Sequence, residues 1–267
     1  MILDVKEYVK QEKEKLKKKV SEPIRKLLII QVGDNPASNA YIKGKIKDAV
    51  ELGHQAMLMK FPDGASADDI YDFIKNNGAD YDGIILQEPA NITINKKKIS
   101  YVTKEAIINE IKDWKDVDGF KRTSAHIPAT PRGIMDYLDY IGCGDLRGQV
   151  VAVVGKGKLV GEPIVPMLMK KGATVISCNS TTPNLGKMLL QANIVIAATG
   201  VRGLIKNEMI SDDTIIIDAG ISVDEQGKLH GDVDPILYER DYVQVTPVPG
   251  GVGLLTRLAL MKNLLGK

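Results

Sequence analysis

Cysteine, histidine and aromatic residues are scarce in this 267-residue sequence. Two cysteines, Cys143 and Cys178, form neither a disulfide framework nor a Cys-x-x-Cys site, which suits a reducing compartment such as the cytoplasm. The three histidines have no metal-ligand spacing to one another or to cysteine. No apolar run approaches membrane-spanning length, and the charged N-terminus lacks the apolar core of a signal peptide. We therefore expect a cytoplasmic protein that binds neither a metal nor a membrane.

Net charge is also small, because 36 Lys and Arg residues stand against 34 Asp and Glu residues. A nucleic-acid-binding domain would show a basic stripe with interleaved aromatic residues. The basic run at residues 10–19 contains no aromatic residue and is predicted to form the solvent-exposed face of an amphipathic helix. The apolar side of that helix is predicted to consist of Leu3, Val5, Val9, Leu16 and Val20. We therefore expect no nucleic-acid partner.

The most informative stretch begins at Val150 and reads VVAVVGKGKLVG. Its first five residues are apolar, which is typical of a strand buried on both faces of a parallel sheet. Gly155, Gly157 and Gly161 follow, before a predicted helix at residues 164–171. Glycines let a backbone approach a dinucleotide pyrophosphate, and the first helical N–H groups face the phosphates. The G-x-G-x-x-x-G spacing is one residue longer than the usual fingerprint, and tight strand-to-helix turns need glycine anyway.

Further strands are predicted downstream at residues 174–178, 194–198 and 214–218, with helices at 184–191 and 207–211 between them. This alternation predicts a doubly wound, Rossmann-like parallel sheet with ligands at the carboxyl ends of its strands. The predicted cofactor-binding residues at those ends are Gly155, Lys156, Gly157, Ser180, Thr199, Gly200 and Ile221.

The second of these strands ends without an acid, at Asn179 and Ser180. NAD-binding folds place an Asp or Glu on the ribose hydroxyls about 20 residues after the glycine turn. The cation of Lys156 and the hydroxyl of Ser180 instead suit the 2′-phosphate of NADP, which a carboxylate would repel. The alternative is that Lys156 is only a solvated loop lysine.

The first half of the chain predicts another α/β domain, with strands at residues 27–33, 55–61 and 82–86 and helices at 37–52 and 67–77. Gly44 lies inside the first of these helices, where it costs about 1 kcal/mol against alanine, so we expect something to pack closely there. The buried stripe of this helix is predicted to be Ile42, Ile46, Ala49 and Val50.

Three polar features of this domain are candidate site residues. Tyr41 and Lys45 are four residues apart and share a helix face, although a helical lysine is usually just solvated. Gln87 and Glu88 follow a buried strand, where ligand-facing groups commonly lie. Asp118, in a tight acidic turn, can either accept hydrogen bonds from an amino-pyrimidine-type ring or cap the turn.

We predict two domains with a cleft between them. The first comprises residues 1–127, with the C-terminal helix at 254–267 packing back onto it, and the second comprises 128–253. Residues 91–109 are polar, with two possible short helices, and a helix is predicted at 133–140. A rigid loop dense in proline and glycine precedes the last helix.

Taken together, six segments resemble the bifunctional methylenetetrahydrofolate dehydrogenase/cyclohydrolase family. They are VGDNPASNAYIKGK (32–45), DGIILQEP (82–89), KDVDG (115–119), PATPRGI (128–134), GKGKLVGEP (155–163) and TPVPGGVG (246–253). The resemblance implies NADP-linked oxidation of 5,10-methylenetetrahydrofolate, then hydrolysis to 10-formyltetrahydrofolate, by a homodimer joined through the nucleotide domain.

The same resemblance implies residue roles. Lys45 is the general acid/base of the hydrolysis with Gln87 beside it, Tyr41 orients the folate, and Asp118 holds its pterin ring. The remaining implied contacts are Leu86, Glu88, Pro249, Gly250, Gly251, Val252 and Gly253 for substrate, and Thr130 for cofactor.

The sequence departs from the family pattern at several points. Lys156 and Gly157 stand where Arg and Ser are usual, Glu88 adds a carboxylate beside the folate site, and Ala129 replaces a cysteine. The stretch between Asp118 and the predicted nucleotide domain is also short. Two alternatives therefore stay open: a dehydrogenase with weak or absent cyclohydrolase activity, and a non-catalytic nucleotide- or folate-binding protein.

Overall fold

The computed structural model describes residues 1–17, 23–94 and 103–267. Its contacts divide the chain into two units. The three-stranded unit comprises Lys13–Ala129 and Arg257–Lys267, and the five-stranded unit comprises Met1–Glu12 and Thr130–Thr256. This division assigns the first twelve residues to the five-stranded unit, whereas the predicted limits assign them to the other domain.

The three-stranded unit is built on parallel strands in the order β2-β1-β3. Each strand is followed by a helix, as a parallel sheet requires. The strands are β1 (Lys26–Val32), β2 (Gln55–Phe61) and β3 (Gly83–Leu86). The helices are α2 (Pro36–Glu51), α3 (Ala67–Asn77) and α4 (Lys104–Glu110), with 3-10 turns η1 (Gly78–Asp80) and η2 (Asp113–Lys115).

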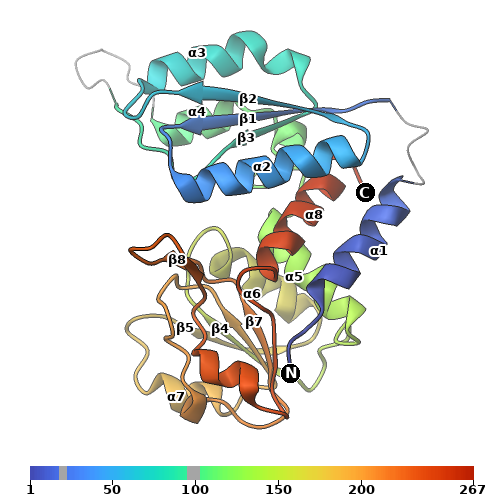
Figure 1. Cartoon of the computed structure of the whole chain (residues 1–267), viewed down its shortest axis with the longest axis vertical. Coiled ribbons are helices and arrows are strands. Elements are labelled where there is room, and N and C mark those ends of the chain that lie inside the picture. The colour runs from blue at the N-terminus through green and yellow to red at the C-terminus, as the bar shows by residue number, and fades with distance from the viewer. Residues whose placement is uncertain (18–22, 95–102) are drawn as a thin grey trace. The chain divides into compact units, whose positions relative to one another are not determined.

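Both faces of this sheet are covered, with α2 on one side and α3 on the other (Figure 1). On the α3 side, Leu28 and Ile30 of β1 join a core with Ile70 and Ile74 of α3. Their neighbours Leu27 and Ile29 are also fully buried. This two-sided burial explains why β1 reads as a continuous apolar run.

Helix α2 begins and ends at the predicted signals. The Asn35 side chain accepts a hydrogen bond from the Ser38 amide, Pro36 stands in the first turn, and Gly53 follows with φ +85°. The predicted burial of Val50 is wrong, because that side chain is 61% exposed. The buried stripe of α2 instead runs through Ser38, Ile42, Lys45, Asp48, Ala49 and Leu52. Polar side chains occupy half of that stripe, so an apolar pattern could not locate it.

Gly44 of α2 admits a side chain from the last helix, α8 (Val252–Leu264). A Cβ placed on Gly44 would lie 2.0 Å from Nη1 of Arg257. The Nε atom of Arg257 lies 2.7 Å from Oδ2 of Asp48, and Lys13 donates to Oδ1 of the same buried carboxylate at 2.6 Å. The close packing expected at Gly44 is therefore present, and an ionic cluster beside it joins α2 to Arg257 of α8 and to Lys13.

Gly44→Ala is expected to lower the free energy of unfolding by about 1–3 kcal/mol, because the added methyl displaces Arg257. In an Arg257→Ala background the same change should instead stabilise the helix by up to about 1 kcal/mol, since alanine is the better helix former. Denaturant unfolding of the four variants measures this double-mutant cycle. A stabilising Gly44→Ala in the otherwise wild-type chain would contradict the packing.

The five-stranded unit has a parallel sheet with strand order β10-β7-β6-β4-β5. The chain reverses direction across the sheet at β4, which is the arrangement of a doubly wound fold. The strands are β4 (Val150–Val154), β5 (Thr174–Cys178), β6 (Ile194–Ala197), β7 (Ile215–Asp218) and β10 (Gln244–Val245), with a separate antiparallel pair β8 (Ser222–Val223) and β9 (Leu229–His230).

Helices also accompany the strands of this sheet. They are α5 (Ala129–Tyr140), α6 (Gly161–Lys170) and α7 (Leu185–Leu189), with 3-10 turns η3 (Asn207–Met209) and η4 (Pro235–Glu239). The helix predicted at residues 207–211 is therefore only a 3-10 turn. Helix α6 starts at Gly161, three residues earlier than predicted, so the third glycine of the turn is already helical.

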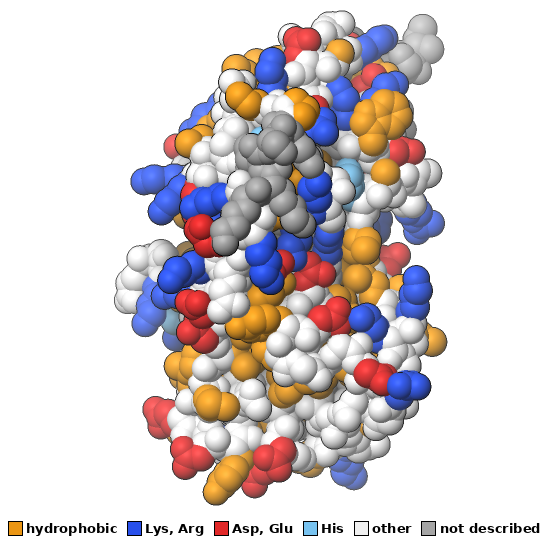
Figure 2. All heavy atoms as spheres, turned by 90° about the vertical axis from the view of Figure 1, so that its right-hand side faces the viewer, with side chains coloured by type: hydrophobic (Ala, Val, Ile, Leu, Met, Phe, Trp, Pro, Cys, Tyr) orange, Lys and Arg blue, Asp and Glu red, His pale blue; other side chains and the backbone are white. Residues whose placement is uncertain are grey.

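Val5, Val9 and Leu16 of helix α1 (Val5–Lys17) are buried, as its amphipathic pattern predicts, and so is Tyr8. Leu3 is buried too, but it lies before the first residue of the helix. The predicted Val20, and part of the polar stretch at residues 91–109, lie outside the described residues. In the described ranges no helix is both long and apolar enough to cross a membrane. On the face in Figure 2, Lys and Arg side chains are interspersed with acidic and apolar ones, which is the pattern of an ordinary mixed surface.

Candidate active site

Lys45, Gln87 and Asp118 meet in the three-stranded unit although they come from three separate segments. The Lys45 Nζ donates to Oε1 of Gln87 at 3.1 Å and to Oδ2 of Asp118 at 3.4 Å. Lys45 is only 4% exposed. A buried ammonium is costly unless it is paired, and here an amide oxygen and a carboxylate supply the pairing.

Gln87 is oriented by the chain around it. It follows β3, and its amide N–H extends the ladder by donating to the Ile30 carbonyl at 2.8 Å. Its side-chain Nε2 donates to the Glu88 carbonyl at 2.7 Å, and the Ser38 hydroxyl donates to the same carbonyl at 3.3 Å. Because the amide nitrogen is engaged there, the amide oxygen faces Lys45.

The acidic turn is capped by Asp116 and not by Asp118. Asp116 accepts hydrogen bonds from the backbone amides of Gly119 and Lys121, at 3.2 and 2.9 Å. The carboxylate of Asp118 is thereby available to Lys45. Burial raises the pKa of Asp118 above its ordinary value, and the Lys45 cation acts in the opposite direction.

Tyr41 lies one helical turn before Lys45 on α2 and is half-buried. Burial raises the pKa of its hydroxyl, while the positive charge of Arg257 lowers it. The phenol therefore stays protonated at neutral pH and offers a hydrogen-bond donor and acceptor next to the Lys45 cluster.

The carboxylate of Glu88, which the sequence adds beside the expected folate site, is paired with other groups of the same unit. Lys104 of α4 forms an ion pair with Oε1 of Glu88, and Oε2 accepts from the Ala90 amide at 3.2 Å. Its charge is therefore offset by a neighbouring cation.

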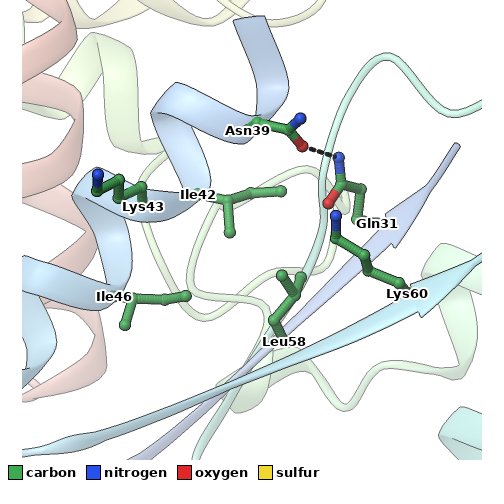
Figure 3. Close-up of a pocket in the computed structure, with 7 residues that line it drawn as sticks. All are labelled: Gln31, Asn39, Ile42, Lys43, Ile46, Leu58 and Lys60. Atoms are coloured by element: carbon green, nitrogen blue, oxygen red, sulfur yellow. Dashed lines mark hydrogen bonds between the residues drawn. The ribbon is translucent and has the colours of Figure 1, made fainter. Parts of the chain in front are cut away.

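A separate pocket of about 230 Å³ lies between α2 and strands β1 and β2. Figure 3 shows Ile42 and Ile46 of α2 pointing toward Leu58 of β2, with Gln31 of β1 donating to Oδ1 of Asn39 at 2.7 Å. Its other lining residues are Lys43 and Lys60. Nothing in the sequence patterns indicated this pocket, and none of the predicted site residues lines it.

In the five-stranded unit, the predicted cofactor residues lie where the parallel strands end. Gly155, Lys156 and Gly157 follow β4, Ser180 follows β5, and Thr199, Gly200 and Ile221 follow β6 and β7. The eighth, Thr130, lies in α5, with its hydroxyl 3.0 Å from that of Thr256.

The glycine turn after β4 requires its glycines. Gly155 has φ +109°, and a Cβ there would lie 2.3 Å from the Ala198 carbonyl oxygen. A Cβ on Gly161 would lie 1.9 Å from the Gly155 carbonyl oxygen. At Gly157 no atom lies within 4 Å of an added Cβ, so the turn is open on that side. This is the close approach of strand and helix that a dinucleotide site uses.

The proline- and glycine-rich loop also belongs to the five-stranded unit. Gly250 has φ +103°, and a Cβ on Gly251 would lie 2.4 Å from the Pro247 carbonyl oxygen. Pro249 is exposed, and Val252 begins α8. The loop is therefore a tight entry turn into the last helix.

Fold and site together define a two-unit α/β protein. One unit is a doubly wound sheet with a dinucleotide-type glycine turn, and the other holds a buried lysine between an amide and a carboxylate. That combination is typical of an enzyme that uses a nucleotide and also moves a proton.

Comparison with known proteins gives the family. Residues 3–118 match the catalytic domain of tetrahydrofolate dehydrogenase/cyclohydrolase, and residues 128–267 match its NAD(P)-binding domain. The bifunctional protein FolD of Polaromonas naphthalenivorans is 37% identical over 250 residues, which cover 90% of this chain and 86% of that protein. The FolD of Bacillus pumilus is 34% identical over 278 residues, covering 98% and 95%.

Two solved structures are similar throughout. The bifunctional FolD dehydrogenase/cyclohydrolase from Campylobacter jejuni has a TM-score of 0.87 at 32% identity and covers 100% of this chain and 97% of its own. The FolD from Trypanosoma brucei, solved with NADP and an inhibitor, has a TM-score of 0.87 at 26% identity, covering 99% and 96%. This chain belongs to the tetrahydrofolate dehydrogenase/cyclohydrolase family, which confirms the resemblance seen in the sequence.

Proposed function

We propose that this protein oxidises 5,10-methylenetetrahydrofolate to 5,10-methenyltetrahydrofolate with NADP and then hydrolyses the product to 10-formyltetrahydrofolate. The observation that carries the proposal is the Lys45 cluster, in which a buried ammonium contacts Gln87 and Asp118. A dehydrogenase needs no buried lysine to move a hydride. Hydrolysis of the methenyl cation does require proton transfer, and Lys45 is the group that can perform it.

In the hydrolysis, water adds to the methenyl carbon and the ring opens as a proton moves to nitrogen. Lys45 has three N–H donors, of which Gln87 and Asp118 accept two. The third is available to the reacting water or to the substrate nitrogen. Asp118 and Gln87 keep the Nζ in place, so that it can return to the same position after each proton transfer.

Asp118 has a second role in this proposal. Lys45 contacts its Oδ2, and its Oδ1 provides acceptor capacity for the N–H groups of a pterin ring. Tyr41 orients the folate from the same helix face as Lys45. The remaining proposed substrate contacts are Leu86, Gln87, Glu88, Pro249, Gly250, Gly251, Val252 and Gly253.

NADP, when bound, accepts the hydride from the methylene carbon. The tight backbone approach at Gly155 and Gly161 fits a dinucleotide pyrophosphate. Lys156 and Ser180, both exposed at strand ends, are proposed to hold the 2′-phosphate. The other proposed cofactor contacts are Thr130, Gly157, Thr199, Gly200 and Ile221.

Lys156→Ala is expected to lower kcat/KM for NADP by about 10- to 100-fold while leaving kcat/KM for NAD nearly unchanged. One charge-assisted contact is worth about 1.5–3 kcal/mol at best, and Lys156 is exposed, so the preference should shrink with added salt. Gly157→Ser, which has open space for its side chain, should raise the preference by adding a hydroxyl. Steady-state kinetics with both cofactors measures these changes. A Lys156→Ala variant with its NADP preference intact would remove Lys156 from the phosphate site.

The two half-reactions test the function separately. Given 5,10-methylenetetrahydrofolate and NADP, the protein should form NADPH. Given 5,10-methenyltetrahydrofolate alone, it should remove the methenyl absorbance faster than buffer does. Failure of the second reaction with success of the first would leave only the dehydrogenase.

We also propose a homodimer joined through the nucleotide-binding domain and a cytoplasmic location. Support for the dimer comes from the family resemblance, and support for the location comes from two cysteines that are both free thiols. Light scattering coupled to size-exclusion chromatography measures the mass in solution and so tests the homodimer.

A further inference from the structure

Two buried carboxylates connect the loops that follow β6 and β7 in the five-stranded unit. Asp218 is the last residue of β7, and Asp232 follows β9. They are 1% and 0% exposed. No family motif identified in the sequence includes either acid, and the proposed reaction does not use them.

Asp232 holds the loop after β6. Its Oδ2 accepts hydrogen bonds from the Thr199 amide at 2.6 Å and from the Thr199 hydroxyl at 2.8 Å. The same hydroxyl oxygen accepts from the Val201 amide at 3.1 Å. One carboxylate oxygen thus fixes both the backbone and the side chain of Thr199, and through them the turn at Gly200.

Asp218 holds Asp232 in turn. Its Oδ1 accepts from the amides of Gly220 and Asp232, at 3.0 and 3.1 Å, and its Oδ2 accepts from the Val233 amide at 3.1 Å. The chain leading to Ile221 and the chain carrying Asp232 are therefore both attached to the end of β7.

Glycines make room for both carboxylates. A Cβ on Gly220 would lie 2.0 Å from Oδ1 of Asp232, and a Cβ on Gly231 would lie 2.0 Å from Oδ2 of Asp218. Each acid therefore packs directly against the backbone of the segment that carries the other.

Burying these two carboxylates lowers the free energy of unfolding unless their charges are compensated. The donors to both carboxylates are backbone amides and one hydroxyl, and in the part of the chain that the structure describes no cation pairs with either acid. Oδ1 of Asp232 is buried without a hydrogen-bond partner. Burial raises the pKa of Asp218 to about 6. Buried acids held in this way contribute little to stability, so a role in shaping the loops is the better explanation.

We infer that Asp232, held by Asp218, is a positioning residue that presets the Thr199–Gly200 turn for NADP. The inference rests on the proposed function, in which Thr199, Gly200 and Ile221 contact the cofactor. Preorganised loops bind a ligand more tightly because no ordering cost is incurred on binding. Loss of the Asp232 acceptor should therefore weaken NADP binding more than it slows hydride transfer.

The test compares full-length variants in steady-state kinetics with NADP varied. Asp232→Ala is expected to raise the KM for NADP about tenfold, with kcat at saturating NADP within about threefold of wild type. Asp232→Asn keeps an acceptor oxygen for Thr199, so its KM should stay within about threefold. Equal impairment of the Asn and Ala variants, or an unchanged KM in both, would overturn the inference.

Asp234→Ala is the matched control, since that carboxylate binds Lys206 at 3.0 Å and the Ile236 amide at 3.3 Å, and neither contact involves Thr199. Its KM for NADP should not change. If Asp232→Ala does not fold, Thr199→Val removes the hydroxyl that donates to Asp232 and accepts from the Val201 amide, and it should raise the KM about three- to fivefold. An unchanged KM in that variant would then overturn the inference.

Calorimetric titration with NADP separates this inference from the proposed function. A wild-type protein that binds NADP but reduces none would refute the proposed dehydrogenase. The Kd of Asp232→Ala relative to wild type would still decide the positioning role, with about tenfold weaker binding expected and equal binding contradicting it.

Discussion

Lys45→Met is expected to lower cyclohydrolase activity by about 10²–10⁴-fold, while NADP-dependent hydride transfer persists. General acid–base groups contribute accelerations of this size, and only the addition of water requires the proton shuttle. Methionine also fills the buried position without a charge, which leaves Asp118 and Gln87 without a cationic partner. The rate of methenyl hydrolysis, measured without NADP, gives the effect directly.

Lys43→Met is the matched control, because Lys43 lies on the same helix, two residues earlier, and is exposed. It should leave both activities unchanged. Full cyclohydrolase turnover in Lys45→Met would remove Lys45 from the mechanism. Loss of both activities together, with a lowered melting temperature, would instead identify Lys45 as a structural residue.

Asp118→Ala is expected to weaken folate binding by about one to two decades while leaving the Kd for NADP unchanged. A hydrogen bond to a charged group is worth about 1.5–3 kcal/mol, and each 1.4 kcal/mol is tenfold in affinity. Since Asp116 caps the turn, the Asp118 change should not unfold it. Titration with folate and with NADP, on the same preparation, measures both constants.

Asp113→Ala offers a comparison, because that partly exposed acid pairs with Lys121 and accepts from the Thr123 hydroxyl at 3.0 Å. It should not alter folate affinity. An unchanged folate Kd in Asp118→Ala would mean that its carboxylate serves only to pair Lys45.

Much of the fold could be predicted because parallel strands have a strong local signature. β1, β4 and β5 are largely apolar runs that end at glycine or polar residues. Their predicted limits agree with the observed ones to within one residue. The meeting of Lys45 and Gln87 was expected only from the family resemblance, because Lys45 lies in the middle of α2 and no local pattern relates it to the residue after β3. The contacts themselves depend on side-chain packing that no local pattern contains.

Features made by distant residues could not be predicted. The apolar pattern of α2 places Val50 in the core, whereas the buried stripe contains Lys45 and Asp48, whose burial depends on partners far along the chain. The choice between Asp116 and Asp118 as the turn cap depends on backbone geometry. Asp218 and Asp232 are fourteen residues apart, and their burial follows from the glycines that face them.

The most direct test of the account is a single reaction with 5,10-methylenetetrahydrofolate and NADP, in which NADPH and methenyl absorbance are followed together. The account predicts that NADPH accumulates steadily, while the methenyl signal stays a small fraction of it because the same protein hydrolyses the intermediate. Methenyl product rising one for one with NADPH, or no NADPH at all, would contradict it.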